Sequence, residues 1–115
     1  MVKRIIFVCT GNTCRSPMAE AIFKDIIEEK GIEEEFEVYS AGVYAFDNDP
    51  ASYQAMEVMK KEFNIDLNYH RAKVLDYSDI EKADLILTMT RHQRDMIIDV
   101  FPEAADKVHV LKEFA

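Results

Sequence analysis

Four segments of this chain have the apolar patterning of β-strands. Residues 5–8 form a continuous apolar run, as expected of a strand that is buried on both faces of a parallel sheet. Residues 36–40 alternate between apolar and polar side chains, which is typical of a half-buried strand. Further strands are predicted at residues 83–88 and 107–111.

Three segments between these strands have the spacing and end signals of helices. The first is predicted to begin with Ser16 as N-cap and to end at Gly31. Asp49-Pro50 is expected to cap and start the second, and Thr90 with Gln93 forms a capping box for the third. The apolar positions that set these helices are Met18, Ala21, Ile22 and Ile26, then Ala55, Met56, Met59 and Phe63, and finally Met96, Ile97 and Val100.

Strands that alternate with helices predict an α/β fold, here a doubly wound, four-stranded parallel sheet flanked by helices. Ligands of such sheets bind beyond the carboxyl ends of the strands, where residues 10–15 leave the first strand. The 115 residues are enough for one domain. Covering both faces of the sheet requires another helix after residues 107–111. We therefore expect a single domain over residues 1–115 that is truncated before its last helix.

Composition excludes several classes of function. Lys and Arg number 14 against 22 Asp and Glu, a net charge of −8, and an acidic chain without a basic run is not expected to bind nucleic acid. The apolar runs are too short for a membrane span or a signal peptide, so we expect a cytoplasmic protein without a membrane partner. Two cysteines are too few for a disulfide framework or a four-ligand zinc site, and no metal is expected.

The loop after the first strand has the residues for phosphate chemistry. Backbone N–H groups before a helix, together with the helix dipole, attract an anion. Such a site stabilises the thiolate of Cys9, while Arg15 offers two parallel donors to phosphoryl oxygens and Ser16 can donate to the sulfur. The alternative is a buried cysteine beside a solvated arginine. The other residues of this predicted phosphate-binding loop are Thr10, Gly11, Asn12, Thr13 and Cys14.

The segment VCTGNTCRSPMAE at residues 8–20 resembles the phosphate-binding signature of the low-molecular-weight protein tyrosine phosphatases. This resemblance implies that Cys9 attacks phosphorus and forms a cysteinyl-phosphate that water hydrolyses, while Arg15 and the loop amides hold the phosphoryl group. It implies no cofactor, a phosphorylated protein as substrate, an oxyanion in the loop, and a monomer. Ser40-Ala41-Gly42, Asp49-Pro50, His70-Arg71-Ala72 and residues 83–90 extend the resemblance.

The resemblance also implies supporting roles. Asn12, Ser40 and His70 resemble a hydrogen-bonded brace behind the loop. Cys14 resembles a second cysteine that forms a reversible disulfide with Cys9 under oxidation, the alternative being a small packing residue.

The general acid of the family is an Asp before a Pro, beyond the fourth strand, and the chain ends at Ala115 before that motif. Asp49-Pro50 matches a different position and is interpreted as a helix start. One alternative function is therefore a non-catalytic phosphate-binding fragment. Arsenate reductase shares the loop but needs further cysteines, and none follows Cys14. A thiol redox sensor would leave Arg15 without a role.

Thr13 bears on the choice of substrate. Tyrosine-specific members carry a bulky aliphatic residue here, whereas Thr resembles the bacterial protein arginine phosphatases of the family. A hydroxyl at this wall suits a guanidinium better than a phenol ring. The resemblance implies that Tyr44 and Phe46 lie in a loop at the mouth of the cleft, the alternative being ordinary packing aromatics. Asp47 and Asp49 nearby would favour a cation there. We therefore expect phosphoarginine as the substrate, with phosphotyrosine as the alternative.

Overall fold

The apolar run at residues 5–8 lies at the centre of the structure, a computed structural model that describes residues 2–114. It belongs to β1 (Lys3–Cys9), which pairs in parallel with β2 (Phe36–Gly42) and with β3 (Leu85–Thr88). β4 (Val108–Val110) pairs with β3, so the order of the sheet is β2-β1-β3-β4. With a strand on either side and helices on both faces, β1 is shielded from water, which explains its uninterrupted apolar run.

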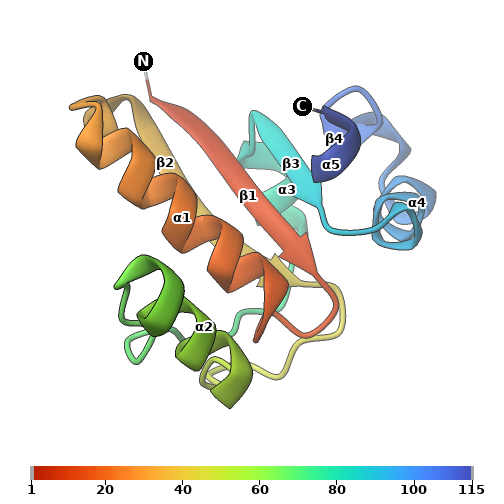
Figure 1. The fold of residues 1–115 in the computed structure, drawn as a ribbon. Helices are drawn as coiled ribbons and strands as arrows, with labels where there is room; N and C mark the ends of the chain where they lie inside the picture. Colours follow the sequence, from red (N-terminus) through yellow and green to blue (C-terminus); the bar gives the residue numbers. More distant parts are fainter. Residues whose placement is uncertain (1, 115) are drawn as a thin grey trace.

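Helices cover both faces of this sheet (Figure 1). α1 (Arg15–Glu29) lies on one face, while α3 (Tyr77–Lys82) and α4 (Arg91–Val100) lie on the other, and α2 (Tyr53–Phe63) packs on α1. This arrangement confirms the predicted doubly wound, four-stranded α/β fold. Short helical segments complete the chain at η1 (Glu33–Glu35), η2 (Pro102–Ala104) and α5 (Leu111–Phe114). Met1 and Ala115, the ends of the domain expected over residues 1–115, lie outside the described residues.

Alternate residues of β1 pack into two different apolar clusters. Ile6 is fully buried in the cluster that includes Ile97 of α4. Phe7 belongs to the cluster on the opposite face, with Ile27 of α1. Each such side chain stabilises the fold by about 1.5–3 kcal/mol when fully buried. A third cluster joins α1 to α2 and the loops around α2, and it consists of Ala21, Ala51, Ala55, Met59 and Leu67.

Two predicted helix starts are wrong. Helix α1 begins at Arg15 with Cys14 in the N-cap position, and Ser16 is buried inside the first turn, where its hydroxyl has other partners. Helix α2 begins at Tyr53, because the side chain of Ser52 accepts the N–H of Ala55. Asp49-Pro50 therefore precedes the helix and neither caps nor starts it.

Other helical predictions have mixed outcomes. The capping box of Thr90 and Gln93 is confirmed. Ile26, Phe63 and Val100 were expected on apolar faces, but these side chains are exposed. Helix α3 was not predicted, although Asp76 and Asp79 form a capping box at its start. Among the described residues, no helix is long and apolar enough to cross a membrane.

Candidate active site

The loop after β1 lies at the carboxyl edge of the sheet and leads directly into α1 (Figure 1). The segment after β2 runs beside it, because Val43 N–H donates to the carbonyl of Cys9 at 3.1 Å and Tyr44 N–H donates to that of Thr10 at 2.9 Å. This close approach requires a residue without a side chain at the end of β2. A Cβ on Gly42 would stand only 2.5 Å from the Thr10 carbonyl oxygen.

Cys9 sits at the base of this loop with its sulfur held by two donors. The sulfur accepts the Asn12 N–H at 3.2 Å and lies 2.9 Å from the Ser16 hydroxyl oxygen. The Asn12 side-chain amide donates to that same hydroxyl oxygen at 2.9 Å. An amide nitrogen can only donate, so the Ser16 oxygen accepts from Asn12. A thiolate can only accept, so with Cys9 in that form the Ser16 proton is directed to the sulfur. Both donors stabilise negative charge on Cys9.

Asn12 connects the loop to the rest of the protein. It is fully buried in the left-handed backbone region, with φ of 56°, a conformation that Asn tolerates better than most residues. Its side-chain oxygen accepts the Lys73 N–H at 2.9 Å, and its side-chain nitrogen donates to Ser40 at 2.8 Å. Its carbonyl oxygen lies 2.7 Å from His70 Nε2. Because a carbonyl oxygen can only accept, Nε2 carries the proton and donates it. The structure thus brings the expected brace of Asn12, Ser40 and His70 together.

Glu20 extends the brace of Asn12, Ser40 and His70, although no role was expected for it from the sequence. The Ser40 hydroxyl donates to one carboxylate oxygen of Glu20 at 2.6 Å, and Lys24 pairs with the other at 2.6 Å. Glu20 is 8 % exposed, which is unusual for a carboxylate, and its two partners satisfy both oxygens. Its position inside the signature segment, four residues before Lys24 on the same helix, was the available signal.

A second polar cluster anchors the segment that reaches Asn12. Asp79 accepts the Tyr39 hydroxyl at 3.0 Å and forms an ion pair with Lys73 at 2.5 Å. Burial and the Asp79 carboxylate raise the pKa of the Tyr39 phenol far above its usual value. Burial alone would lower the pKa of Lys73, but its hydrogen bond to Asp79 and the nearby carboxylates raise it. The cluster fixes residue 73, whose N–H supports the loop after β1 through Asn12.

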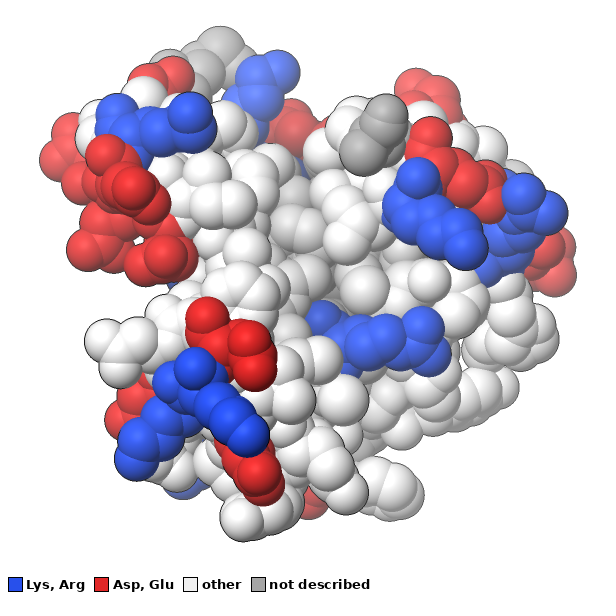
Figure 2. All heavy atoms as spheres, in the orientation of Figure 1, with Lys and Arg blue, Asp and Glu red and all other residues white. Residues whose placement is uncertain are grey.

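Arg15 is the first residue of α1 and is exposed. Its side chain has no hydrogen bond or ion pair with any other residue that the structure describes, so the guanidinium is available to an anion. A dense acidic cluster lies away from it: Figure 2 shows acidic side chains gathered over the carboxyl-terminal end of α1. A helix of 15 residues is about 22 Å long, well beyond the Debye length of about 8 Å at physiological salt. This acidic cluster is therefore screened from the loop.

The remaining predicted residues lie around the loop. Thr13 is half-buried and its carbonyl accepts the Ser52 N–H at 2.7 Å, while Cys14 is half-buried against the cluster between α1 and α2. Tyr44 and Phe46 are 69 % and 76 % exposed. Gly11 would accept a Cβ without a clash, since the nearest atom is 3.7 Å away. The structure describes residues 2–114, and these hold no group of three metal-ligating side chains.

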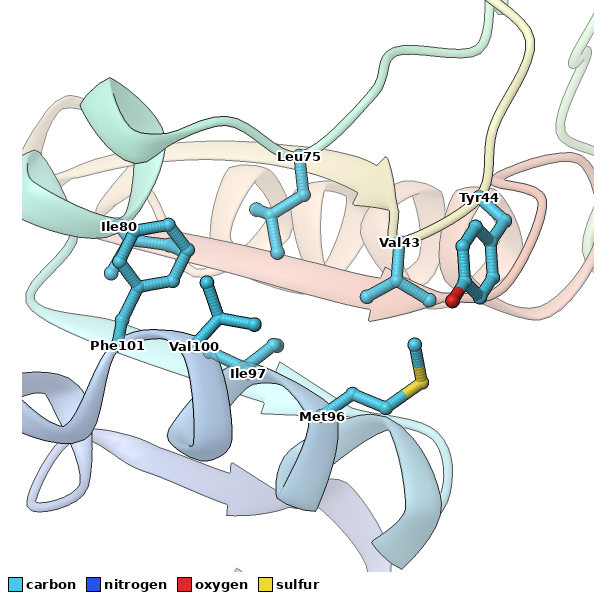
Figure 3. A pocket seen from close by; sticks show the side chains of 8 residues that line it. All are labelled: Val43, Tyr44, Leu75, Ile80, Met96, Ile97, Val100 and Phe101. Carbon is cyan, nitrogen blue, oxygen red and sulfur yellow. The ribbon is translucent and has the colours of Figure 1, made fainter.

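Tyr44 lines an apolar hollow of about 210 Å³ between α4 and the segment after β2 (Figure 3). Phe46 does not contribute to it. One carboxylate oxygen of Asp47 accepts the Val74 N–H at 2.9 Å, so at most the other oxygen is left for a ligand. The other residues that line the hollow are Val43, Leu75, Ile80, Met96, Ile97, Val100 and Phe101.

Known proteins share this fold. A protein-arginine-phosphatase of Bacillus subtilis is 47 % identical over 96 % of this chain and 71 % of the relative. The crystal structure of a low molecular weight protein tyrosine phosphatase from T. tengcongensis matches with a TM-score of 0.91 at 48 % identity, over 97 % of this chain and 75 % of that one. A mutant arginine phosphatase with a phosphorylated active-site serine matches with a TM-score of 0.90 at 46 % identity, over 96 % and 70 %.

The expectation drawn from the signature segment is confirmed at the level of the family. The match extends from residue 4 to residue 115, and it includes the loop, the brace and the strands that support them. This chain therefore belongs to the family of low molecular weight phosphotyrosine protein phosphatases.

Proposed function

We propose that this protein is a cysteine-dependent phosphatase that hydrolyses phosphorylated arginine side chains of proteins. The observation that carries the proposal is the pair of donors on the Cys9 sulfur, the Asn12 N–H and the Ser16 hydroxyl. A thiolate is the nucleophilic form of cysteine, and these donors stabilise it at the base of an anion-binding loop. The same donors stabilise the sulfur when it departs.

In the first step, the Cys9 thiolate attacks phosphorus and the bond from phosphorus to the substrate nitrogen breaks. The substrate nitrogen takes up a proton from water, and the phosphoryl group is then bonded to sulfur. The loop amides and the Arg15 guanidinium hold the three phosphoryl oxygens as their charge develops. Arg15 is suited to this role because it has no competing partner among the residues of the described structure.

In the second step, water attacks the phosphorus of the cysteinyl-phosphate and the bond from phosphorus to sulfur breaks. Inorganic phosphate is released and Cys9 returns to the thiolate. Ser16 assists because its proton is directed to the sulfur, a geometry fixed by the Asn12 amide on the other side of its oxygen. Ser16 is therefore a leaving-group stabiliser, and Asn12 positions it. A catalytic thiol must stay reduced, which supports a cytoplasmic location.

Two observations support phosphoarginine as the substrate class. The relative from Bacillus subtilis, 47 % identical, is named a protein-arginine-phosphatase. Thr13 places a hydroxyl in the loop where an aliphatic side chain would present only apolar surface. A side chain that can form hydrogen bonds at the wall of the cleft favours a guanidinium over a phenol ring. The phosphotyrosine alternative predicts the same chemistry with an oxygen leaving group, so the two differ only at the wall of the cleft.

The test is phosphate release from a phosphoarginine peptide and from a phosphotyrosine peptide of matched sequence. We expect the protein to prefer phosphoarginine, Cys9→Ser to release nothing, and Thr13→Ile to shift the preference towards phosphotyrosine. A preference of the unmodified protein for phosphotyrosine would replace the substrate class and keep the mechanism. If neither peptide releases phosphate, the proposal is wrong and a non-catalytic phosphate-binding module becomes the favoured function.

A further inference from the structure

Gln93 connects α4 to the phosphate-binding loop. Its side chain is 3 % exposed, and its oxygen accepts two backbone N–H groups, those of Met89 and Thr90, both at 3.0 Å. Two N–H donors can point only at an oxygen, so the orientation of this amide is fixed. The nitrogen of the same amide then faces the hydroxyl oxygen of Thr10, at 3.1 Å.

This orientation also fixes the Thr10 hydroxyl. An amide nitrogen has no lone pair to offer, so the Thr10 oxygen accepts from Gln93 and its own proton points elsewhere. Within the described structure this proton has no acceptor. The backbone of Thr10 is equally constrained, because its carbonyl accepts the Tyr44 N–H at 2.9 Å. The result is a hydroxyl on an exposed residue, directly after Cys9 in the chain, with a free donor and a set position.

We propose that Gln93 is a positioning residue that fixes the Thr10 hydroxyl as a hydrogen-bond donor to the phosphoryl group held in the loop. The inference rests on the proposed function, since it assumes a phosphoryl group bound there. The unprotonated oxygens of a phosphoryl group only accept hydrogen bonds, so a donor at this position stabilises them. A Thr10 hydroxyl that donated to α4 instead would turn its lone pairs towards the anion.

Three substitutions separate this role from a structural one. Gln93→Glu keeps an oxygen for both backbone N–H groups, and Glu is a natural residue at this position of a capping box. It replaces the donor facing Thr10 by an acceptor, so the Thr10 hydroxyl turns to donate to it. Thr10→Val removes the hydroxyl at nearly equal volume, and Thr10→Ser keeps it.

The measurement is the affinity of the protein for inorganic phosphate by titration calorimetry, with thermal unfolding of each variant alongside. A hydrogen bond to a charged group corresponds to about a tenfold change in affinity. We expect Thr10→Val and Gln93→Glu each to weaken phosphate binding by about tenfold, and Thr10→Ser to stay within about twofold. The melting temperatures should remain close to that of the unmodified protein. The double variant should bind no more weakly than either single variant, because both changes remove the same donor.

The outcomes distinguish this inference from the proposed function. Unchanged phosphate affinity in Thr10→Val overturns the inference and leaves the phosphatase proposal intact. If the losses of phosphate affinity multiply in the double variant of Thr10→Val and Gln93→Glu, the negative charge of the new Glu acts by itself. That result overturns the positioning role of Gln93. Absence of phosphate binding by the unmodified protein overturns both proposals together.

Discussion

Gly42 offers the sharpest test of how the sheet sets the geometry of the loop. It is the pairing partner of Cys9 at the end of β2. A Cβ at this position would stand 2.5 Å from the Thr10 carbonyl oxygen and 2.9 Å from the Asn12 nitrogen. Both are backbone atoms of the loop, which cannot rotate away as a flexible side chain would. Gly42→Ala must therefore move the loop or the end of the strand.

The size of the effect follows from these distances. Carbon and oxygen atoms approach to about 3.4 Å, so the loop backbone must shift by about 1 Å. Overpacking of this kind costs about 1–3 kcal/mol in the free energy of unfolding. A shift of about 1 Å in a catalytic group can lower the rate by about 100-fold. We expect Gly42→Ala to lose about 100-fold in kcat/KM while remaining folded.

The assay is phosphate release from the preferred phosphopeptide, with urea unfolding of the same preparations. Gly31→Ala is the matched control, because Gly31 has φ of 71° and a Cβ added there would have no atom within 4 Å. Its cost of about 1–2 kcal/mol comes from the left-handed backbone alone, at the far end of α1. The control should lose stability and keep kcat/KM. If Gly42→Ala behaves like Gly31→Ala, the strand end has yielded instead of the loop, and the reasoning is refuted.

Three further predictions concern other parts of the site. Arg15→Lys should lower kcat/KM by about 100-fold, because a single ammonium cannot replace the planar fork, while urea unfolding stays within about 0.5 kcal/mol of the unmodified protein. Tyr39→Phe should lower the free energy of unfolding by about 1 kcal/mol at pH 7, since it removes the hydrogen bond to Asp79. The raised pKa of Tyr39 keeps the phenol neutral in the folded protein, so its stabilisation is complete below the unfolded-state pKa of about 10 and is lost as the pH rises further. Urea unfolding between pH 7 and pH 11 should show the difference between the two proteins shrinking, and a constant difference would contradict this explanation. After Cys14→Ser, dithiothreitol should no longer restore activity lost to peroxide, and mass spectrometry should find sulfinic or sulfonic acid on Cys9. Recovery equal to that of the unmodified protein would show that Cys14 only packs.

The arrangement of the loop after β1 was accessible from the sequence because its parts are consecutive. One stretch of residues contains the end of a buried strand, the loop and the start of a helix, and local patterns describe each of them. Ser16 shows the limit of local patterns. A serine at a helix start usually caps it, but here the hydroxyl binds the sulfur of Cys9 and the amide of Asn12. The choice between these partners depends on the depth of burial, which spacing does not reveal.

The supporting contacts were less accessible because they join distant segments. The Gln93 amide reaches Thr10 across 83 positions of the chain, and the Lys73 N–H reaches Asn12 across 61. Backbone donors such as that of Lys73 carry no sequence signal, since every residue except proline has one. Helix α3 was missed for a different reason. Its capping residues Asp76 and Asp79 were visible, but six residues are too few for a helical period to emerge.

The hydrogen bonds of Asn12 have a consequence for the newly made chain. Its partners are spread from Cys9 to Lys73, so the loop cannot take its final shape while only the first strand and helix have left the ribosome. The nucleophile is thus synthesised early and becomes competent late, after the segment around His70 has closed over the loop. A nascent or partly unfolded chain exposes an ordinary thiol rather than a poorly selective phosphatase. Formation of the site is in this way coupled to completion of folding.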